Sequence, residues 1–393
     1  MTDHLMHNVV RLPVNFVKGE GAYLYDDQGK RYLDALCGIA VTALGHAHPV
    51  ITETICDQAK KLIHASNLYC VENQQKLADK LCSISGMENA FFCNSGAEAN
   101  EAAIKIARLH GHNKGIDVPH VIVMEHNFHG RTMATLTASA SAKVQAGFEP
   151  LVSGFVRVPY DNIDAVKSLA ATRKDIVAIL VEPVIGEGGI KVPAPGFLKS
   201  LREICDQQQW LLMLDEIQCG TGRTGKWFAF QHENILPDVL TVAKALGNGM
   251  PIGVCLARGV AAEVFKPGNH GTTFGGNPLS SATGLAVLNT IEKDKLLGRV
   301  SELGERILGG LKGKLNGNAG ITHIRGKGLM IGIQLEKDCA DIVKRALDKG
   351  LLLNVTAGNV VRLLPPYILS NEQADHIIDT VSELVTQFLA EQQ

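Results

Sequence analysis

Short apolar runs alternate with segments of helical periodicity through the middle of the chain, from residue 50 to residue 285. The apolar runs lie at 90–93, 120–125, 175–183, 210–214, 238–244 and 251–257. Between these runs, apolar residues follow helical spacing at 97–110 and again at 196–209. Strands that are apolar on both faces are typical of a mainly parallel sheet covered by helices. The pattern therefore predicts an α/β domain over 50–285.

The pattern changes after residue 285. A long amphipathic helix is predicted at 296–315, and a closing helix is expected to start with the capping-box pair Ser370 and Gln373. Strands are predicted at 328–335, 351–355 and 359–365. These elements indicate a small α+β domain over 286–393. The first segment, 1–49, contains a hairpin-like stretch at 21–36 and is expected to pack beside that domain.

Composition narrows the class of protein. The chain of 393 residues has 46% hydrophobic and 20% charged residues and a net charge of −2. That charge gives no reason to expect nucleic acid or an anionic membrane as a partner. The chain shows neither a secretory signal nor an apolar span long enough for a bilayer. Nine cysteines without a C-x-x-C pair indicate reduced thiols in the cytoplasm, and the histidine spacings predict no metal site.

Lys244 stands at the end of the apolar run 238–244, and Gly247 and Gly249 follow it closely. Taken alone, this lysine is best explained by a stem that lies along apolar surface while the ammonium reaches water. Other polar residues, however, also follow predicted strands. Ligands of open parallel sheets bind beyond the carboxyl ends of the strands. These polar residues are Ser95, Gly96 and Ala97, Phe128 and Arg131, and Asp215 and Glu216.

Together these residues suit one cofactor, pyridoxal 5′-phosphate. Small residues at 95–97, at the start of a helix, offer backbone N–H groups to a phosphate. Phe128 supplies an aromatic plate, and a buried Asp215 would keep the pyridine nitrogen protonated. A lysine with a lowered pKa would form the Schiff base with the cofactor aldehyde. This combination favours a catalytic Lys244 over a snorkelling one.

Several long segments also resemble one family. They are NSGAEANEAAIKIAR, HGRT, VEPVIGEGG, LMLDEIQCGTGRTG, AKALGNGMPIG and HGTTFGGNPL, with GIAVTALGHAHP at 38–49. The chain is similar over nearly its whole length to the class III aminotransferases of the aspartate aminotransferase superfamily. The resemblance implies the pyridoxal-phosphate fold type I, whose large domain has a mainly parallel seven-stranded sheet. It is strongest to bacterial members that act on N-acetylornithine.

The resemblance implies a role for each matching residue around the cofactor. Lys244 would form the Schiff base and carry the proton between the cofactor and the substrate carbon. Asp215 would pair with the pyridinium nitrogen, Gln218 would hydrogen-bond the ring oxygen, and Phe128 would stack on the ring. The phosphate would be held by Ser95, Gly96 and Ala97. Thr273 resembles a phosphate ligand supplied by the neighbouring subunit, which implies a homodimer, and Thr272 would lie near the substrate.

The implied reaction moves the terminal amino group of N2-acetyl-L-ornithine to 2-oxoglutarate by a ping-pong mechanism. Its products are N-acetyl-L-glutamate 5-semialdehyde and L-glutamate, and it belongs to arginine biosynthesis. Arg131 resembles the residue that holds the remote carboxylate of the substrate, a task suited to its bidentate fork. Arg362 would hold the α-carboxylate of glutamate. Glu187 resembles a switch that pairs with Arg362 and swings away when glutamate binds.

Other functions remain open from the sequence. The amino donor is alternatively ornithine, succinylornithine, succinyldiaminopimelate or 4-aminobutyrate. Two positions leave this choice open: Ile185 departs from the family pattern, and Asn15 stands where related enzymes vary. A pyridoxal-phosphate isomerase or racemase would retain Lys244 and Asp215 without exchanging an amino group. A catalytically silent nucleotide-binding scaffold is a third class, but CNSGAEAN lacks the G-x-G-x-x-G spacing.

Overall fold

The computed structural model describes residues 4–392, and its largest sheet has seven strands. Strand β10 runs opposite to the other six strands of this sheet, so the predicted mainly parallel sheet is confirmed. In spatial order the strands are β4 (Asn89–Cys93), β10 (Gly253–Ala257), β9 (Val239–Val242), β8 (Leu211–Asp215), β7 (Ile176–Val181), β5 (His120–Met124) and β6 (Phe155–Val158).

Six of these strands coincide with the predicted apolar runs, and β6 is the one that was not predicted. It lies at the edge of the sheet, where only Val158 is fully buried and Arg157 is exposed. An edge strand needs no continuous apolar run, because one side of it has no neighbouring strand. The hydrophobic pattern therefore gave no signal for it.

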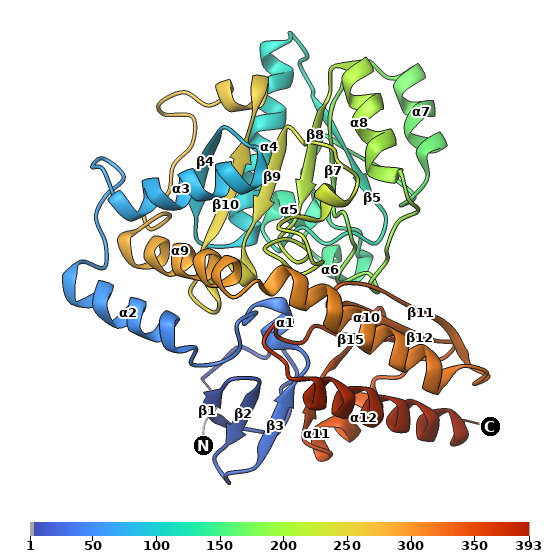
Figure 1. Cartoon of the computed structure of the whole chain (residues 1–393). Helices are drawn as coiled ribbons and strands as arrows, with labels where there is room; N and C mark the ends of the chain where they lie inside the picture. The colour runs from blue at the N-terminus through green and yellow to red at the C-terminus, as the bar shows by residue number, and fades with distance from the viewer. Residues whose placement is uncertain (1–3, 393) are drawn as a thin grey trace.

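Helices cover both faces of the sheet (Figure 1). Leu212 and Leu214 of β8 pack in one apolar cluster with Leu201 of α8, whereas Leu211 and Met213 pack in another with helix α4. Alternate residues of one strand thus face two different helical layers, which explains the uninterrupted apolar runs. The helices of this region are α3 (Glu72–Ser85), α4 (Gly96–Asn113), α5 (Met133–Ala138), α6 (Ala142–Gln145), α7 (Ile163–Thr172), α8 (Phe197–Gln208) and α9 (Pro278–Lys293).

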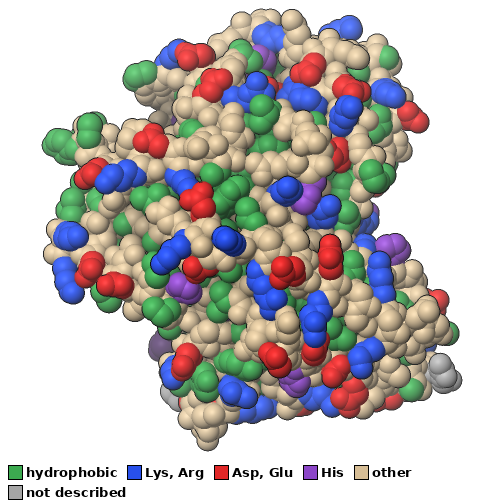
Figure 2. Space-filling model, in the orientation of Figure 1, with side chains coloured by type: hydrophobic (Ala, Val, Ile, Leu, Met, Phe, Trp, Pro, Cys, Tyr) green, Lys and Arg blue, Asp and Glu red, His purple; other side chains and the backbone are tan. Residues whose placement is uncertain are grey.

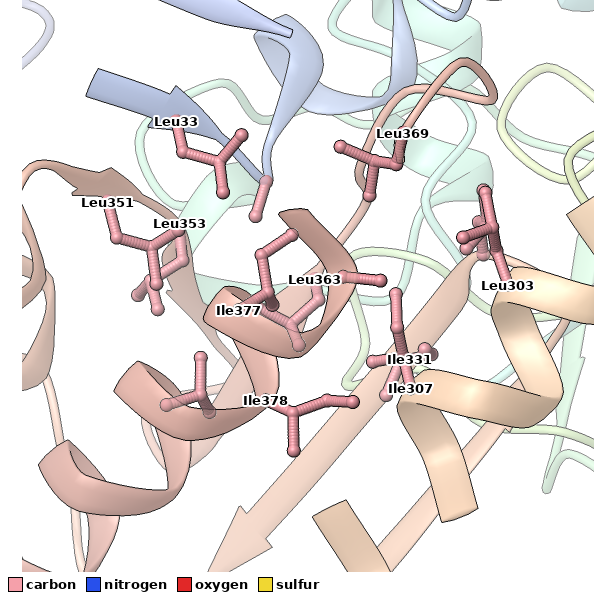
Figure 3. Close-up of a cluster of buried hydrophobic side chains, with 14 of the residues drawn as sticks. Leu33, Leu303, Ile307, Ile331, Leu351, Leu353, Leu363, Leu369, Ile377 and Ile378 are labelled. Carbon is pink, nitrogen blue, oxygen red and sulfur yellow. The ribbon is translucent and has the colours of Figure 1, made fainter. Parts of the chain in front are cut away.

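A second, antiparallel sheet lies in the C-terminal region with strand order β11-β12-β15-β14. Its apolar face packs against α10 and α12, and Figure 3 shows Leu303 and Ile307 of α10 facing Ile331 and Leu363 of this sheet. The elements are α10 (Leu296–Leu315), β11 (Ile321–Lys327), β12 (Met330–Leu335), α11 (Asp341–Asp348), β14 (Asn354–Thr356), β15 (Val360–Leu363) and α12 (Asn371–Ala390). The predicted capping box of α12 is present, with Ser370 Oγ accepting from Gln373 N at 3.2 Å.

The N-terminal strands form a third sheet together with a strand from the C-terminal region. Its members are β1 (Phe16–Glu20), β2 (Tyr23–Asp26), β3 (Arg31–Asp34) and β13 (Leu351–Leu352). β2 and β3 form the expected hairpin, and Figure 1 shows this sheet beside α11, away from the seven-stranded sheet. Helices α1 (Cys37–Ala40) and α2 (Pro49–Lys61) then lead into the large region. The boundaries at residues 49 and 285 stay a prediction, and residues 1–3 and 393 lie outside the described part.

Two strand predictions in the C-terminal region need correction. The predicted strand 351–355 is two strands, β13 and β14, which belong to different sheets, because the chain passes from one sheet to the other at Leu353. Strand β11 was not predicted, since its partly exposed sequence includes His323 and Arg325 and lacks an alternating apolar pattern.

The charge of the surface and the polarity of the helices bear on the kinds of partner that the protein can have. On the face shown in Figure 2, Lys and Arg side chains are interspersed with Asp and Glu, as the net charge of −2 leads one to expect. Within residues 4–392, every helix is too short or too polar to cross a membrane.

Candidate active site

One cavity of about 380 Å³ gathers residues from the ends of five strands of the large sheet. The cofactor residues predicted from the sequence line it, apart from Thr273. They are Ser95, Gly96 and Ala97 after β4, Phe128 after β5, Asp215 and Gln218 at the end of β8, and Lys244 after β9. Residues far apart in the sequence meet here because parallel strands end at the same edge of a sheet.

Lys244 is the first residue of a 3₁₀ turn, Lys244–Gly247, that follows β9. Its φ of +44° lies in the left-handed region, which a lysine rarely adopts. Burial lowers the pKa of the Lys244 amine below its usual value, with Glu187 opposing this effect and Arg362 adding to it. A lowered pKa makes the uncharged, nucleophilic amine available at a lower pH. A lysine that snorkels to water would not show this environment.

The carboxylate of Asp215 is buried and held by hydrogen bonds on both oxygens. Its Oδ2 accepts from Asn100 Nδ2 and from His129 Nδ1, each at 2.7 Å. Its Oδ1 accepts from the backbone N–H of Ile217 at 3.1 Å. Asn100 is fixed in turn, because Thr241 Oγ1 donates to its side-chain oxygen at 2.8 Å. These bonds orient the buried carboxylate of Asp215 in the cavity.

Sequence reasoning did not assign Asn100 or His129 to the site. His129 stands in the segment HNFHGR, but its carboxylate partner is 86 residues away, so no metal or acid–base spacing marked it. Asn100 lies inside helix α4 and is fully buried between the apolar residues Ala99 and Ala103. A polar side chain on the apolar face of a helix is the signal that would have identified it.

An anion site is built at the start of α4. Ser95 is the N-cap residue, and its Oγ accepts from Glu98 N at 3.2 Å. The backbone N–H groups of Gly96 and Ala97, in the first turn, have no acceptor within the helix, and the helix dipole favours an anion beside them. A side chain at position 253 would place Cβ 2.2 Å from the Ser95 carbonyl oxygen, so Gly253 lets β10 run directly against this turn.

The predicted switch pair is formed in the structure. Arg362 of β15 is fully buried, and its Nη1 lies 2.6 Å from Glu187 Oε1. Asn354 Oδ1 accepts from Arg362 Nε at 3.0 Å, while Nη2 is buried without a hydrogen-bond partner among the described residues. Burial acts to raise the pKa of Glu187, but the charge and hydrogen bond of Arg362 outweigh it and lower that pKa. The pair is therefore ionised, and Arg362 keeps one donor available.

Neither Glu187 nor Arg362 is among the residues that line the cavity, although their charges act on the Lys244 amine. The remaining predicted substrate residues lie at or beyond the edge of the cavity. Arg131 is exposed and lines the cavity, with its guanidinium carbon 5.7 Å from the centre of the Phe128 ring. Thr272 is not among the lining residues, but its Oγ1 accepts from Asn94 Nδ2, which lines the cavity, at 3.4 Å. Thr273 is exposed and outside the cavity of its own chain. The phosphate-binding role of Thr273 in a neighbouring subunit therefore stays a prediction.

Two further acids are buried near Asp215. Glu182 lines the cavity, and burial together with the charge of Asp215 raises its pKa to about 7. Burial also raises the pKa of Glu216 to about 7, although its carboxylate accepts from the backbone N–H groups of Ala229 and Phe230 at 2.6 and 2.9 Å. Within the described part of the chain, no three His, Cys, Asp or Glu side chains come together as metal ligands do.

Comparison with known proteins identifies the class. The profile of the class-III aminotransferases matches residues 5–385, and the chain belongs to this family. Members depend on pyridoxal phosphate, and the residues present fit that cofactor. The helix N-terminus suits its phosphate, Phe128 its ring, Asp215 its ring nitrogen and Lys244 its aldehyde. The protein is accordingly a pyridoxal-phosphate-dependent transaminase.

Particular relatives are similar over the full length. The acetylornithine aminotransferase of Nitrosomonas europaea is 56% identical, over 98% of this chain and 98% of its own length. Acetylornithine aminotransferase 1 of Bordetella pertussis is 49% identical, over 100% of both chains. Among solved structures, the ornithine aminotransferase of Toxoplasma gondii ME49 has a TM-score of 0.95 at 32% identity, covering 99% of this chain and 94% of its own. The acetylornithine aminotransferase of Elizabethkingia anophelis has a TM-score of 0.87 at 34% identity, covering 98% of this chain and 96% of its own.

The raised pKa of Glu216 predicts a pH dependence of stability. The unfolded chain releases this proton near the ordinary pKa of 4.5, whereas the folded protein keeps it up to about 7. Raising the pH through this window therefore removes stability from the folded state. The side chain of the Glu216→Gln variant cannot ionise, so the variant does not lose this stability. The measurement is the urea midpoint of unfolding of the variant minus that of the wild type, with pyridoxal phosphate saturating throughout. This difference should rise from pH 5 to pH 8.

The change with pH is the informative quantity in this experiment. The glutamine amide meets a backbone N–H where a carboxylate oxygen stood, which lowers the midpoint of the variant equally at every pH. A difference that stays flat or falls between pH 5 and pH 8 would contradict the raised pKa.

Proposed function

We propose that this protein transfers the terminal amino group of N2-acetyl-L-ornithine to 2-oxoglutarate. The products are N-acetyl-L-glutamate 5-semialdehyde and L-glutamate, and the reaction serves arginine biosynthesis. The observation that carries the proposal is the ion pair of the buried Arg362 with the partly exposed Glu187 beside Lys244, because it lets one pocket accept two different kinds of substrate. Full-length relatives at 56% and 49% identity that bear the name acetylornithine aminotransferase support the choice of donor.

The chemistry follows from the buried groups. When bound, pyridoxal phosphate supplies an electron sink for the bond that breaks at the substrate carbon. Asp215, oriented by His129 and Asn100, holds the ring nitrogen in its protonated form. The Lys244 amine, whose pKa is lowered by burial, carries the proton to and from the substrate carbon. Phe128 and Gln218 line the cavity and would orient the ring of the bound cofactor.

The two half-reactions make opposite demands on Arg362. N-acetylornithine offers one carboxylate, which Arg131 binds, and Glu187 then neutralises Arg362. Glutamate offers two carboxylates, so Glu187 must give up its partner to the second one. A buried ion pair roughly offsets its own desolvation, so this exchange costs little. The free Nη2 of Arg362 provides a donor for the incoming carboxylate.

The donor is tested by a panel with 2-oxoglutarate as the fixed acceptor. We expect kcat/KM for N-acetylornithine to exceed that for ornithine by about a hundredfold, because the free α-ammonium of ornithine would be desolvated without an anionic partner. The panel includes succinylornithine, succinyldiaminopimelate and 4-aminobutyrate. Lys244→Ala is the inactive control. A higher kcat/KM for ornithine would overturn the proposed donor, and no transfer of nitrogen to 2-oxoglutarate would point to an isomerase or racemase.

We also propose that two copies of the chain form a homodimer with shared active sites. Large exposed hydrophobic side chains lie on the loop that carries Thr273 and on a second loop, which are joined by the hydrogen bond from Asn67 Nδ2 to Gly275 O at 3.1 Å. These side chains are Leu62, Ile63, Leu68, Tyr69 and Phe274. Exposed apolar patches of this kind mark interaction surfaces. A partner seated here would receive the Thr273 hydroxyl.

The shared site predicts complementation between two variants. Heterodimers of Lys244→Ala and Thr273→Ala chains, isolated through two different tags, should hold one site with intact Lys244 and intact Thr273. We expect one pyridoxal phosphate per heterodimer at wild-type affinity and about half of the wild-type activity. The Thr273→Ala homodimer should bind the cofactor about tenfold more weakly, as loss of a hydrogen bond to a charged group implies. Heterodimers without a site of wild-type affinity would contradict sharing.

We place the reaction in the cytoplasm. All nine cysteines are free in the structure, and unpaired thiols persist in reducing compartments. Fractionation of the source cells should recover the transaminase activity with the cytoplasmic enzymes. Recovery with a secreted or periplasmic fraction would contradict this assignment.

A further inference from the structure

The loop Gly186–Gly189, which carries Glu187, is held by hydrogen bonds from several separate elements. The carboxylate of Glu182 accepts from Gly186 N at 3.1 Å. The hydroxyl of Thr356 donates to the carbonyl oxygen of Glu187, and the guanidinium of Arg325 donates to the carbonyl oxygens of Gly189 and Ile190. The backbone on both sides of Glu187 is therefore fixed.

Two of these anchors come from the same sheet as Arg362. Thr356 lies on β14 and Arg325 on β11, while Arg362 lies on β15 between β14 and β12. In the ladder, Thr356 is opposite Val360, two residues from Arg362. One small sheet thus holds both the guanidinium and the backbone of the residue that pairs with it. Strand register therefore helps to set the distance between the Arg362 guanidinium and the Glu187 backbone, in addition to the packing of the large region against the small one.

The loop has little room to move as a unit. A Cβ at position 188 would lie 2.2 Å from the carbonyl oxygen of His126, and one at position 186 would lie 2.4 Å from the amide of Gln218. Backbone hydrogen bonds between Ile185 and Lys191, at 3.0 and 3.1 Å, close the base of the loop. A displacement of Glu187 by a shift of its backbone would break these contacts. Rotation of the side chain breaks none of them.

We propose that Thr356 is a positioning residue for the exchange of Arg362 between Glu187 and a substrate carboxylate. By fixing the Glu187 carbonyl, its hydroxyl restricts the exchange to rotation of the Glu187 side chain and keeps the ion pair in register when that side chain returns. This inference rests on the proposed two-substrate function. Without the hydroxyl, the carboxylate of Glu187 pairs less well with Arg362, and the freed guanidinium favours dicarboxylate substrates.

Thr356→Val tests this role because it removes the hydroxyl while nearly keeping the shape of the side chain. The measurement is each half-reaction by itself, followed as the change in visible absorption of the cofactor-loaded enzyme with N-acetylornithine or with glutamate. We expect the ratio of kcat/KM for N-acetylornithine to kcat/KM for glutamate to fall about three- to tenfold, the range that one hydrogen bond represents. Glu187→Gln, which removes the charge itself, should lower the ratio further.

Two controls separate positioning from stability. Thr290→Val removes another buried hydroxyl that donates to a backbone carbonyl, that of Ala286 at 2.8 Å in α9, and should leave the ratio unchanged. Thr356→Ser keeps the hydroxyl and should restore the wild-type ratio. If Thr356→Val lowers both half-reactions in proportion, or raises the ratio, the inference is wrong.

The design also distinguishes failure of the inference from failure of the proposed function. If the wild type favours a different monocarboxylate donor, the proposed donor is wrong, and the same ratio measured with that donor still decides the role of Thr356. If Thr356→Val yields no folded protein, Arg325→Lys takes its place. That change removes the fork that spans the Gly189 and Ile190 oxygens, and the ratio is expected to fall in the same way.

Discussion

The buried guanidinium of Arg362 is the constraint on which the site depends. A buried cation is costly unless a charge and hydrogen bonds compensate it, and here the compensation comes from Glu187, on the loop after β7, and from Asn354 on the neighbouring strand. Glu187 belongs to the large α/β region and Arg362 to the small C-terminal sheet. The pair therefore links these two regions of the fold, and its charges act on the nearby Lys244 amine.

The large sheet contributes the groups that do not have to move. Asp215 is fixed by Asn100 and His129, and Lys244 by the turn that begins directly after β9. Burial has opposite consequences for the two kinds of group, because it favours the neutral form of each. It lowers the pKa of Lys244 and raises those of Glu182 and Glu216. A preorganised cavity is suited to proton transfer at a substrate carbon.

Alternation between two substrates requires mobility in one place and rigidity around it. The side chain of Glu187 is partly exposed, whereas the backbone that carries it is tied to Glu182, Thr356 and Arg325. Packed backbone tends to be bistable rather than continuously deformable, so a loop that shifted as a whole would disturb Gln218, a predicted cofactor residue beside Gly186. A rotating side chain on a rigid loop avoids that cost.

The sequence alone determined the large sheet and the residues that follow its strands, because both depend on local rules. Apolar runs predict strands, parallel strands end at one edge, and Ser95, Asp215 and Lys244 each follow their own strand. The edge strand β6, the strand β11 and the partners of Asp215 were not predicted, since edge strands lack continuous burial and His129 lies 86 residues from its carboxylate. Only the tertiary structure decided that Thr356 and Arg325 hold the Glu187 loop. Every residue has a backbone carbonyl, so the sequence does not indicate which carbonyl a distant side chain will bind. That is decided only by where the two segments meet in the fold.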